Sequence, residues 1–216
     1  DIGFVLLCAA FVFVMTPGLA MFYGGLVRKK NVVNTMMTSI FIIGVGIVMW
    51  VLFGYSLSFA PSGNAFIGDF RWLGLEGVSL TEGYTDDASI PNMVFSAFQM
   101  MFAVITPALI TGAVAGRMKF KSIFVFTIFW SLIVYYPLAH MVWGQGGLLG
   151  ADGIGALDFA GGDVVHISSG VSALVLCILL GKRHDYEHSI YRIHNIPTVV
   201  LGASLLMFCL LYTSDA

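Results

Sequence analysis

The chain has 216 residues, of which 58% are hydrophobic and 10% are charged, and its mean hydropathy is +0.92. Soluble domains carry about 25% charged residues, and a soluble core of this size could not bury so much apolar surface. The net charge of −2 and the isoelectric point near 6.2 give no basic surface, so we expect no nucleic-acid partner. The composition predicts an all-α, polytopic bundle of transmembrane helices whose surroundings are the lipid bilayer.

Five apolar runs are long enough to cross a membrane. A helix rises about 1.5 Å per residue, so about 20 apolar residues span the hydrocarbon layer of about 30 Å. Each run therefore predicts one transmembrane helix. In chain order the runs cover residues 2–27, 36–60, 92–115, 122–143 and 159–180.

A sixth apolar run begins at Pro197, which suits the first turn of a helix because its missing N–H would have no partner there. The run reaches only Leu211, about five residues short of a full span. We therefore expect a truncated sixth helix and a chain that is part of a longer protein. The predicted organisation is five transmembrane helices over residues 1–182, a cytoplasmic loop over 183–196 and the truncated helix over 197–216.

Positive charge is confined almost entirely to alternate loops. Short cytoplasmic loops retain Lys and Arg, so the sequence predicts that the N-terminus lies outside and that the protein is integral to the plasma or inner membrane. The outer loop at 61–91 carries one basic residue, Arg71, and several acidic residues. The other basic residues are Arg28, Lys29, Lys30, Arg117, Lys119, Lys121, Lys182, Arg183 and Arg192.

The spans contain no Lys or Arg at depth, which argues against a retinal protein with a buried Schiff-base lysine and against a voltage sensor. Glycine is frequent instead and predicts close approach of the helices. The glycines singled out are Gly44, Gly46, Gly112, Gly116 and Gly170. The sequence has no HExxH, GxSxG or Walker motif, so we expect no enzyme, no cofactor and no metal site.

His166 is the clearest candidate for chemistry, because ionisable side chains inside a bilayer are costly. If the fifth helix begins near Phe159, His166 lies about 10 Å below its start and is predicted to face the interior of the protein. A neutral core histidine bonded to a neighbouring helix explains its position equally well.

Asp158 lies where a glycine-rich loop turns into the fifth helix. An Asp there suits an N-cap, because its carboxylate accepts hydrogen bonds from the free N–H groups at the positive end of the helix dipole. Stabilising a cation in an outer vestibule is the alternative. Trp143 ends the fourth helix at the outer interface, where most tryptophans are membrane anchors, although an indole ring is also the best side-chain partner for a small cation.

Phe95, Phe98 and Phe102 are three and four residues apart and form one stripe along the third helix. Such a stripe is more often core packing than a gate, and the sequence leaves both interpretations open.

Three segments resemble the ammonium transporter family, which includes the Amt, Mep and Rhesus proteins. Residues 17–28, PGLAMFYGGLVR, are similar to the end of the family's first helix, and residues 139–144, AHMVWG, to the end of its fourth. Residues 158–169, DFAGGDVVHISS, are similar to the family signature at its fifth helix. The three segments occur in the family's order, each at the expected span.

The resemblance implies an eleven-helix fold in which this chain is the first of two inverted repeats and the start of the second. It implies a homotrimer that transports ammonium or ammonia, with a cytoplasmic regulator of the PII type as a candidate partner. Trp143 and Phe98 would form an outer recruitment site structured by Asp158. Phe102 would be one ring of a hydrophobic gate, and His166 would be the first of two pore histidines.

The family's second pore histidine, its second gate ring and a hydroxyl of its recruitment site belong to later helices. We therefore expect that this chain alone does not conduct ammonium. The alternative function is an ammonium sensor coupled to a signalling partner.

Overall fold

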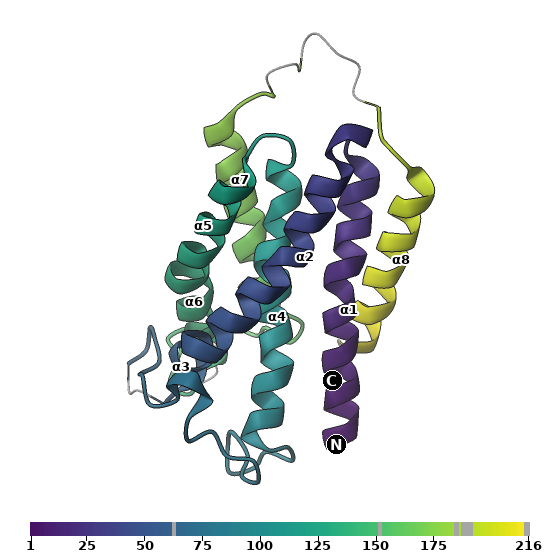
Figure 1. The fold of residues 1–216 in the computed structure, drawn as a ribbon. Helices are drawn as coiled ribbons and strands as arrows, with labels where there is room; N and C mark the ends of the chain where they lie inside the picture. Colours follow the sequence, from purple (N-terminus) through teal and green to yellow (C-terminus); the bar gives the residue numbers. More distant parts are fainter. Residues whose placement is uncertain (62–63, 151–152, 184–185, 187–191, 214–216) are drawn as a thin grey trace.

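The computed structural model describes residues 1–61, 64–150, 153–183, 186 and 192–213, and these form a bundle of helices (Figure 1). Much of the predicted loop at 183–196, and the last residues of the predicted sixth helix, lie outside the described residues. The α-helices are α1 (Ile2–Leu26), α2 (Val32–Met49), α3 (Tyr55–Phe59), α4 (Asn92–Val114), α5 (Phe120–Trp130), α6 (Tyr136–Trp143), α7 (Ser168–Leu180) and α8 (Ile196–Thr213).

Short 3-10 and π-helical segments join several of these helices into longer units. The 3-10 segments are η1 (Lys29–Asn31) and η3 (Leu73–Leu75), and the π-helical segments are η2 (Trp50–Gly54), η4 (Ser131–Tyr135) and η5 (Gly162–Ile167). Five continuous units are long and apolar enough to cross a membrane, which confirms the five predicted spans. They are Ile2–Leu26, Lys29–Phe59, Asn92–Val114, Phe120–Trp143 and Gly162–Leu180.

Two predicted helix starts differ from the structure. The second unit begins at Lys29 rather than at residue 36, because the polar residues after the first span already form η1 and the first turns of α2. The fifth unit begins at Gly162 rather than at residue 159, because Gly161 adopts a left-handed conformation with φ of 76° that ends the preceding loop. Phe159 consequently lies in the loop, where it is 90% exposed.

The bundle packs around α1 and α4. Figure 1 shows α8 running alongside α1, and α1 also contacts α2 and α4. Val12 and Leu19 of α1 are buried in one core with Ile105 and Ala108 of α4. A second core is rich in aromatic side chains, including Trp50, Tyr55, Phe59, Tyr135 and Tyr136.

The glycine predictions hold for some helix contacts and fail for others. A Cβ added at Gly46 would lie 2.9 Å from Val104 of α4, and one added at Gly112 would collide with the Tyr23 ring of α1, so both glycines allow close helix packing. Gly116 adopts a φ of 71° and serves a turn. At Gly44 and Gly170 an added Cβ would meet nothing within 4 Å, so the prediction is wrong there, because both face away from the bundle.

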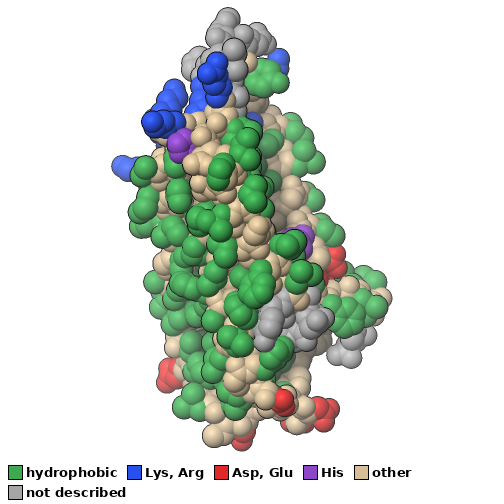
Figure 2. Space-filling view, turned by 90° about the vertical axis from the view of Figure 1, so that its right-hand side faces the viewer, with side chains coloured by type: hydrophobic (Ala, Val, Ile, Leu, Met, Phe, Trp, Pro, Cys, Tyr) green, Lys and Arg blue, Asp and Glu red, His purple; other side chains and the backbone are tan. Residues whose placement is uncertain are grey.

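The two ends of the bundle differ in charge. Figure 2 shows Lys and Arg gathered at one end and Asp and Glu mostly toward the other. The loops at 27–31 and 115–119 lie at the basic end, and the loop at 60–91 lies at the acidic end (Figure 1). At the acidic end Arg71 forms an ion pair with Asp69 at 2.7 Å, and its guanidinium lowers the pKa of the Asp69 carboxyl.

Candidate functional site

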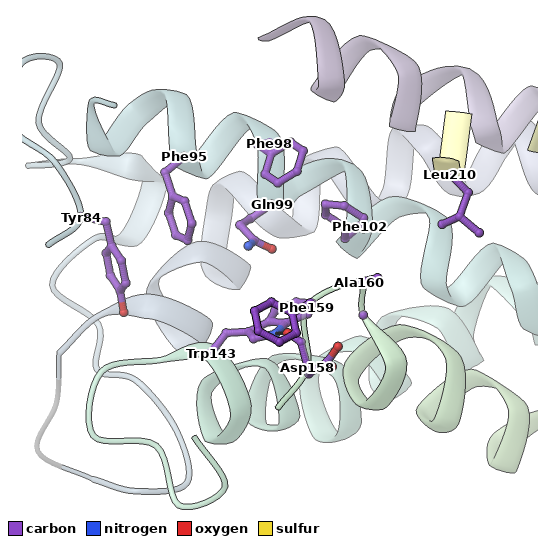
Figure 3. Close-up of a pocket in the computed structure, with 11 residues that line it drawn as sticks. Tyr84, Phe95, Phe98, Gln99, Phe102, Trp143, Asp158, Phe159, Ala160 and Leu210 are labelled. Atoms are coloured by element: carbon purple, nitrogen blue, oxygen red, sulfur yellow. Dashed lines mark hydrogen bonds between the residues drawn. The ribbon is translucent and has the colours of Figure 1, made fainter. Parts of the chain in front are cut away.

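A cavity of about 420 Å³ lies between α4, the end of α6 and the segment that leads into η5. Figure 3 shows side chains of α4 on one side of this cavity and those of Trp143, Asp158 and Phe159 on the other. Four of the five predicted site residues line it, namely Phe98, Phe102, Trp143 and Asp158. The other lining residues are Tyr84, Phe95, Gln99, Phe159, Ala160, Gly161 and Leu210.

The wall on α4 is the predicted phenylalanine stripe. Phe98 and Phe102 lie edge to face, with ring centroids 5.1 Å apart and planes at 86°. Both rings are half-buried. Phe95, one turn closer to the acidic end, stacks on Tyr84 with ring centroids 4.9 Å apart. The stripe therefore packs against Tyr84 of the 64–91 loop at one end and presents rings to the cavity along its length, while a gating role stays a prediction.

The opposite wall is built around Trp143, which ends α6. Its indole Nε1–H donates a hydrogen bond to the backbone carbonyl oxygen of Asp158 at 3.1 Å. The indole is half-buried and lines the cavity. This bond ties the end of α6 to the segment before η5, so it fixes the orientation of the ring.

The Asp158 carboxylate caps the helix that follows it, as predicted, but from three residues before Gly161, which holds the N-cap position itself. Its Oδ1 accepts the N–H of Gly162 at 2.6 Å, and its Oδ2 accepts the N–H groups of Asp163 and Val164 at 2.9 and 3.0 Å. These are free donors of the first helical turn, and the carboxylate also interacts favourably with the helix dipole. Because the same residue holds Trp143 through its carbonyl, one aspartate positions both the helix and the indole.

Tyr84 brings the loop at 60–91 to the cavity. The backbone N–H of Gln145 donates to the Tyr84 hydroxyl at 3.1 Å, and the Gln145 side-chain amide donates to the Tyr84 carbonyl at 3.0 Å. Burial raises the pKa of the Tyr84 phenol, so the ring is neutral at physiological pH. The two hydrogen bonds anchor the loop to the residues just after α6.

Gln99 is a cavity residue to which we assigned no role from the sequence. Its amide lies between the ring of Phe98 and the opposite wall at Trp143 (Figure 3). Its Oε1 is buried and has no hydrogen-bond partner among the described residues. An amide inside an apolar span is itself a signal of a functional position, and this signal could have identified Gln99. Gln99 thus contributes a buried acceptor without a partner to the wall of the cavity.

His166 is the predicted site residue that does not line the cavity. It lies in η5, and its side chain is exposed on this half of the protein, so its predicted place in the interior of the complete protein stays a prediction. The buried side of this segment is occupied by Val164, Val165 and Ser169.

The fold and the site together define a class of protein. Five helical units of membrane length make it a polytopic membrane protein, and it has a cavity lined by aromatic rings, a carboxylate and an amide. The family model described as the Ammonium Transporter Family matches residues 3–211, and the chain belongs to this family. The resemblance seen in three sequence segments is thereby confirmed.

Individual relatives agree with this assignment. The chain is 51% identical over 208 residues to an ammonium transporter of Bacillus subtilis, and the match covers 96% of the chain and 50% of that protein. The fold is similar to the crystal structure of Saccharomyces cerevisiae Mep2, with a TM-score of 0.85, 35% identity and coverage of 99% and 47% of the two chains. A sensor Amt protein is also similar, with a TM-score of 0.83, 26% identity and coverage of 96% and 52%. The chain thus spans about half the length of these relatives.

Proposed function

We propose that the complete protein transports ammonium or ammonia across a membrane and that the cavity is its outer recruitment site. The observation that carries this proposal is the convergence of Phe98, Phe102 and Trp143 on one cavity, next to the capped carboxylate of Asp158. The ammonium transporter of Bacillus subtilis supplies the substrate class by similarity.

The cavity offers a small cation two kinds of replacement for its hydration shell. Aromatic faces attract a cation by about 0.5–2 kcal/mol each, and Trp is the strongest of them. The Oε1 atom of Gln99 would accept an N–H from the ligand. Binding would then remove the unfavourable free energy of a buried acceptor that has no partner. The Asp158 carboxylate already accepts three backbone N–H groups, so its role is to structure the site rather than to bind the cation directly.

Beyond the cavity, Phe102 forms one ring of a hydrophobic gate, and the substrate crosses as ammonia or in a proton-shared form. His166 lines the lumen between this half of the protein and the second half. The exposed face of α7 supports this placement, because it is apolar over Leu174 and Ile178, which are 61% and 70% exposed, and a dry lumen needs such a face. Because later helices complete the lumen, the chain alone does not conduct ammonium.

The protein resides in the plasma or inner membrane with its N-terminus outside, as the gathering of Lys and Arg, except Arg71, at one end of the bundle supports. It assembles as a homotrimer, and its basic cytoplasmic end is the place for a regulator of the PII type. A role as a sensor is less favoured, since the relative with 51% identity is a transporter, although a sensor Amt protein shares the fold. Transport is a non-enzymatic function.

The test is methylammonium uptake by proteoliposomes that contain the complete protein, compared with its Trp143→Leu and His166→Ala variants. Loss of one cation–π partner is expected to lower the apparent affinity about 2- to 30-fold in Trp143→Leu. His166→Ala is expected to reduce the maximal rate. Phe129→Leu is the matched control, because Phe129 lies on α5, is 58% exposed and does not line the cavity.

Uptake that falls in the two variants and not in the control would support the proposal. If the complete protein is well folded and takes up no methylammonium, the proposed transport function is wrong. If the unmodified protein and the three variants take up methylammonium equally, the roles proposed for Trp143 and His166 are wrong.

A further inference from the structure

His140 is a buried histidine that the proposed transport function does not use. It lies in the last turn of α6, one turn before Trp143, and its side chain is 0% exposed. A titratable side chain inside a membrane unit is costly, and its position is by default a candidate for function. The hydrogen-bond partners of the imidazole ring indicate which protonation state the fold stabilises.

Both ring nitrogens of His140 face backbone carbonyl oxygens. Nδ1 lies 3.0 Å from the carbonyl oxygen of Ser58, and Nε2 lies 2.8 Å from that of Asn64. A carbonyl oxygen only accepts hydrogen bonds, and a neutral imidazole has a single N–H to donate. Turning the ring over would place two C–H groups against the same oxygens. Only the doubly protonated ring, an imidazolium, donates an N–H to both acceptors.

The place of His140 in its helix also favours a positive charge. The fourth membrane unit is helical from Phe120 to Trp143, so the negative end of its helix dipole lies at Trp143. Cations in the last turn of a helix are stabilised by this dipole and by carbonyl groups that have no partner within the helix. The two acceptors and the helix end are independent features, and both favour the imidazolium.

No ionised side chain of the described residues bonds to this ring. The α6 helix packs chiefly against α3, η4 and η5. In the 64–91 loop, Asp69 and Arg71 pair with each other and the other carboxylates are exposed. The titratable groups of α6 itself, of its neighbouring elements and of the segment before η5 form no hydrogen bond or ion pair with the imidazole, and they are Tyr55, Tyr135, Tyr136, Asp158, Asp163 and His166. The charge on His140 therefore depends on the two carbonyl groups and the helix end.

The imidazole joins α6 to α3 and to the loop that follows α3. Ser58 lies in α3, and Asn64 lies in the loop. Next to Asn64, the carbonyl oxygen of Ala65 accepts the N–H of Leu148 at 2.9 Å, so the loop is also tied to the segment after α6. Space beside the ring is tight, since a Cβ added at Gly144 would lie 2.7 Å from Nδ1 of His140. The ring thus lies against the backbone directly after Trp143.

We propose that His140 is a buried imidazolium that holds α3 and the following loop on α6 and thereby positions the Trp143 wall of the cavity. The His140 clamp consists of His140 and the carbonyl groups of Ser58 and Asn64. Both hydrogen bonds are present while the ring is doubly protonated. When the pH rises and one proton leaves to solvent, one nitrogen becomes an acceptor that faces an acceptor, and its bond is lost.

His140 is a positioning residue, because it acts on the ligand through Trp143. This effect on recruitment rests on the proposed function, whereas the charge and the clamp do not. The experiments therefore measure the charge, the clamp and the transport separately.

Heteronuclear NMR of the imidazole nitrogens in the complete, isotope-labelled protein tests the charge. The chemical shift of a ring nitrogen separates its protonated form from its unprotonated form, and the His140 signals are those that disappear in His140→Gln. Two protonated nitrogens are expected at neutral pH. An unprotonated nitrogen in His140 at neutral pH would overturn the proposal.

Hydrogen exchange of the unmodified protein tests the clamp without a substitution. The N–H groups of Gly68 and Leu148 donate to the carbonyl groups of Leu57 and Ala65, so their protection reports whether the loop is docked. Relative to the intrinsic exchange rate at each pH, this protection is expected to fall about tenfold or more at alkaline pH, because a hydrogen bond from a charged donor is lost. The N–H of Gly181, at the basic end, is the internal control. Protection of Gly68 and Leu148 that is independent of pH would overturn the clamp.

Methylammonium uptake by the complete protein tests the positioning role. In the unmodified protein the apparent affinity for the methylammonium cation is expected to fall with rising pH in parallel with the protection of Leu148. His140→Gln has N–H donors without a charge, so its affinity is expected to be lower and to lack this transition. Ser58→Ala is the matched control, since it removes a buried hydroxyl without a partner among the described residues and keeps the carbonyl group. It is expected to retain the pH profile of the unmodified protein.

The same pH profile in His140→Gln and in the unmodified protein would overturn the positioning role. If the unmodified protein takes up no methylammonium, the proposed transport function is wrong, while NMR and hydrogen exchange still decide the charge and the clamp. If His140→Gln does not fold, the exchange profile of the unmodified protein decides: a fall in protection with rising pH supports the clamp, and constant protection overturns it.

Discussion

Gln99 places an unpaired amide oxygen in an otherwise aromatic wall. Leucine is of similar size and removes this atom, so Gln99→Leu is expected to raise the free energy of unfolding by about 1 kcal/mol or more. The same change removes an acceptor for ammonium and should weaken its recruitment. Thermal unfolding in detergent and the concentration dependence of methylammonium uptake measure the two effects separately.

Gln145→Leu is the matched control for this prediction. Gln145 is also near the cavity, but its amide donates to the Tyr84 carbonyl, so its loss is expected to lower the free energy of unfolding by about 0.5–1.5 kcal/mol. If Gln99→Leu is destabilised to the same extent, Gln99 has a partner in the complete protein and is not an acceptor for the ligand.

At the residue scale, the sequence predicts which residues form the site better than it predicts where their side chains point. Trp143 and Asp158 lie at helix ends, and Phe98 and Phe102 share one helix face, so each position already restricts where the side chain can lie. The direction of His166 could not be predicted, because apolar residues are spread around the following α7 helix with little asymmetry and mark no single face for burial. The unpaired oxygen of Gln99 becomes visible only after its neighbours are packed.

Asp158 acts at the scale of the element, because it caps the start of η5 and α7. Asp158→Ala is expected to lower the free energy of unfolding by about 0.5–2 kcal/mol, since three N–H groups lose their acceptor. Asp158→Asn is expected to lose part of this stability, because its single amide oxygen can replace only one of the two accepting carboxylate oxygens. Thermal unfolding of the two variants in detergent measures the difference.

Asp163→Ala controls for the loss of a carboxylate in the first turn, since the cap is formed by Asp158 rather than by the Asp163 side chain. A smaller effect is expected there. Equal losses in Asp158→Ala and Asp163→Ala would mean that charge near the helix dipole, rather than capping, stabilises this helix.

The helical elements could be predicted in number from apolar length alone, but their starts could not. Hydropathy does not register Lys29 and Asn31 as helical, yet they lie in η1 and extend the second unit. It does register Phe159 as apolar, but the left-handed Gly161 excludes it from the helix. Local backbone geometry decides these boundaries, and apolar composition carries little information about it.

At the scale of the whole molecule, the separation of charge predicts how the protein is inserted. A cysteine that replaces the exposed Asp87 is expected to react with a membrane-impermeant maleimide in intact cells. A cysteine that replaces the exposed Lys182, at the basic end, is expected to react only after permeabilisation. Labelling is read from the mobility of the purified protein on a gel.

The protein without added cysteines is the control, since Cys8 and Cys209 are buried and Cys177 is partly buried. The reverse labelling pattern would place the N-terminus inside. The overall charge pattern could be read directly from the sequence because it depends on the order of the loops. The outward direction of Gly44 and Gly170 could not, because it depends on which helices become neighbours.

Three of the five membrane units contain a π-helical segment, namely η2, η4 and η5. A π-turn holds about one residue more than an α-turn, so the chain beyond it is rotated by about 100° relative to an unbroken α-helix. Deleting one residue within η2 would restore the α-turn and swing Tyr55 and Phe59 out of the aromatic core. The number of residues in a span therefore determines which side chains pack together. A relative with one residue fewer in η2 would need a different set of aromatic residues to form this core.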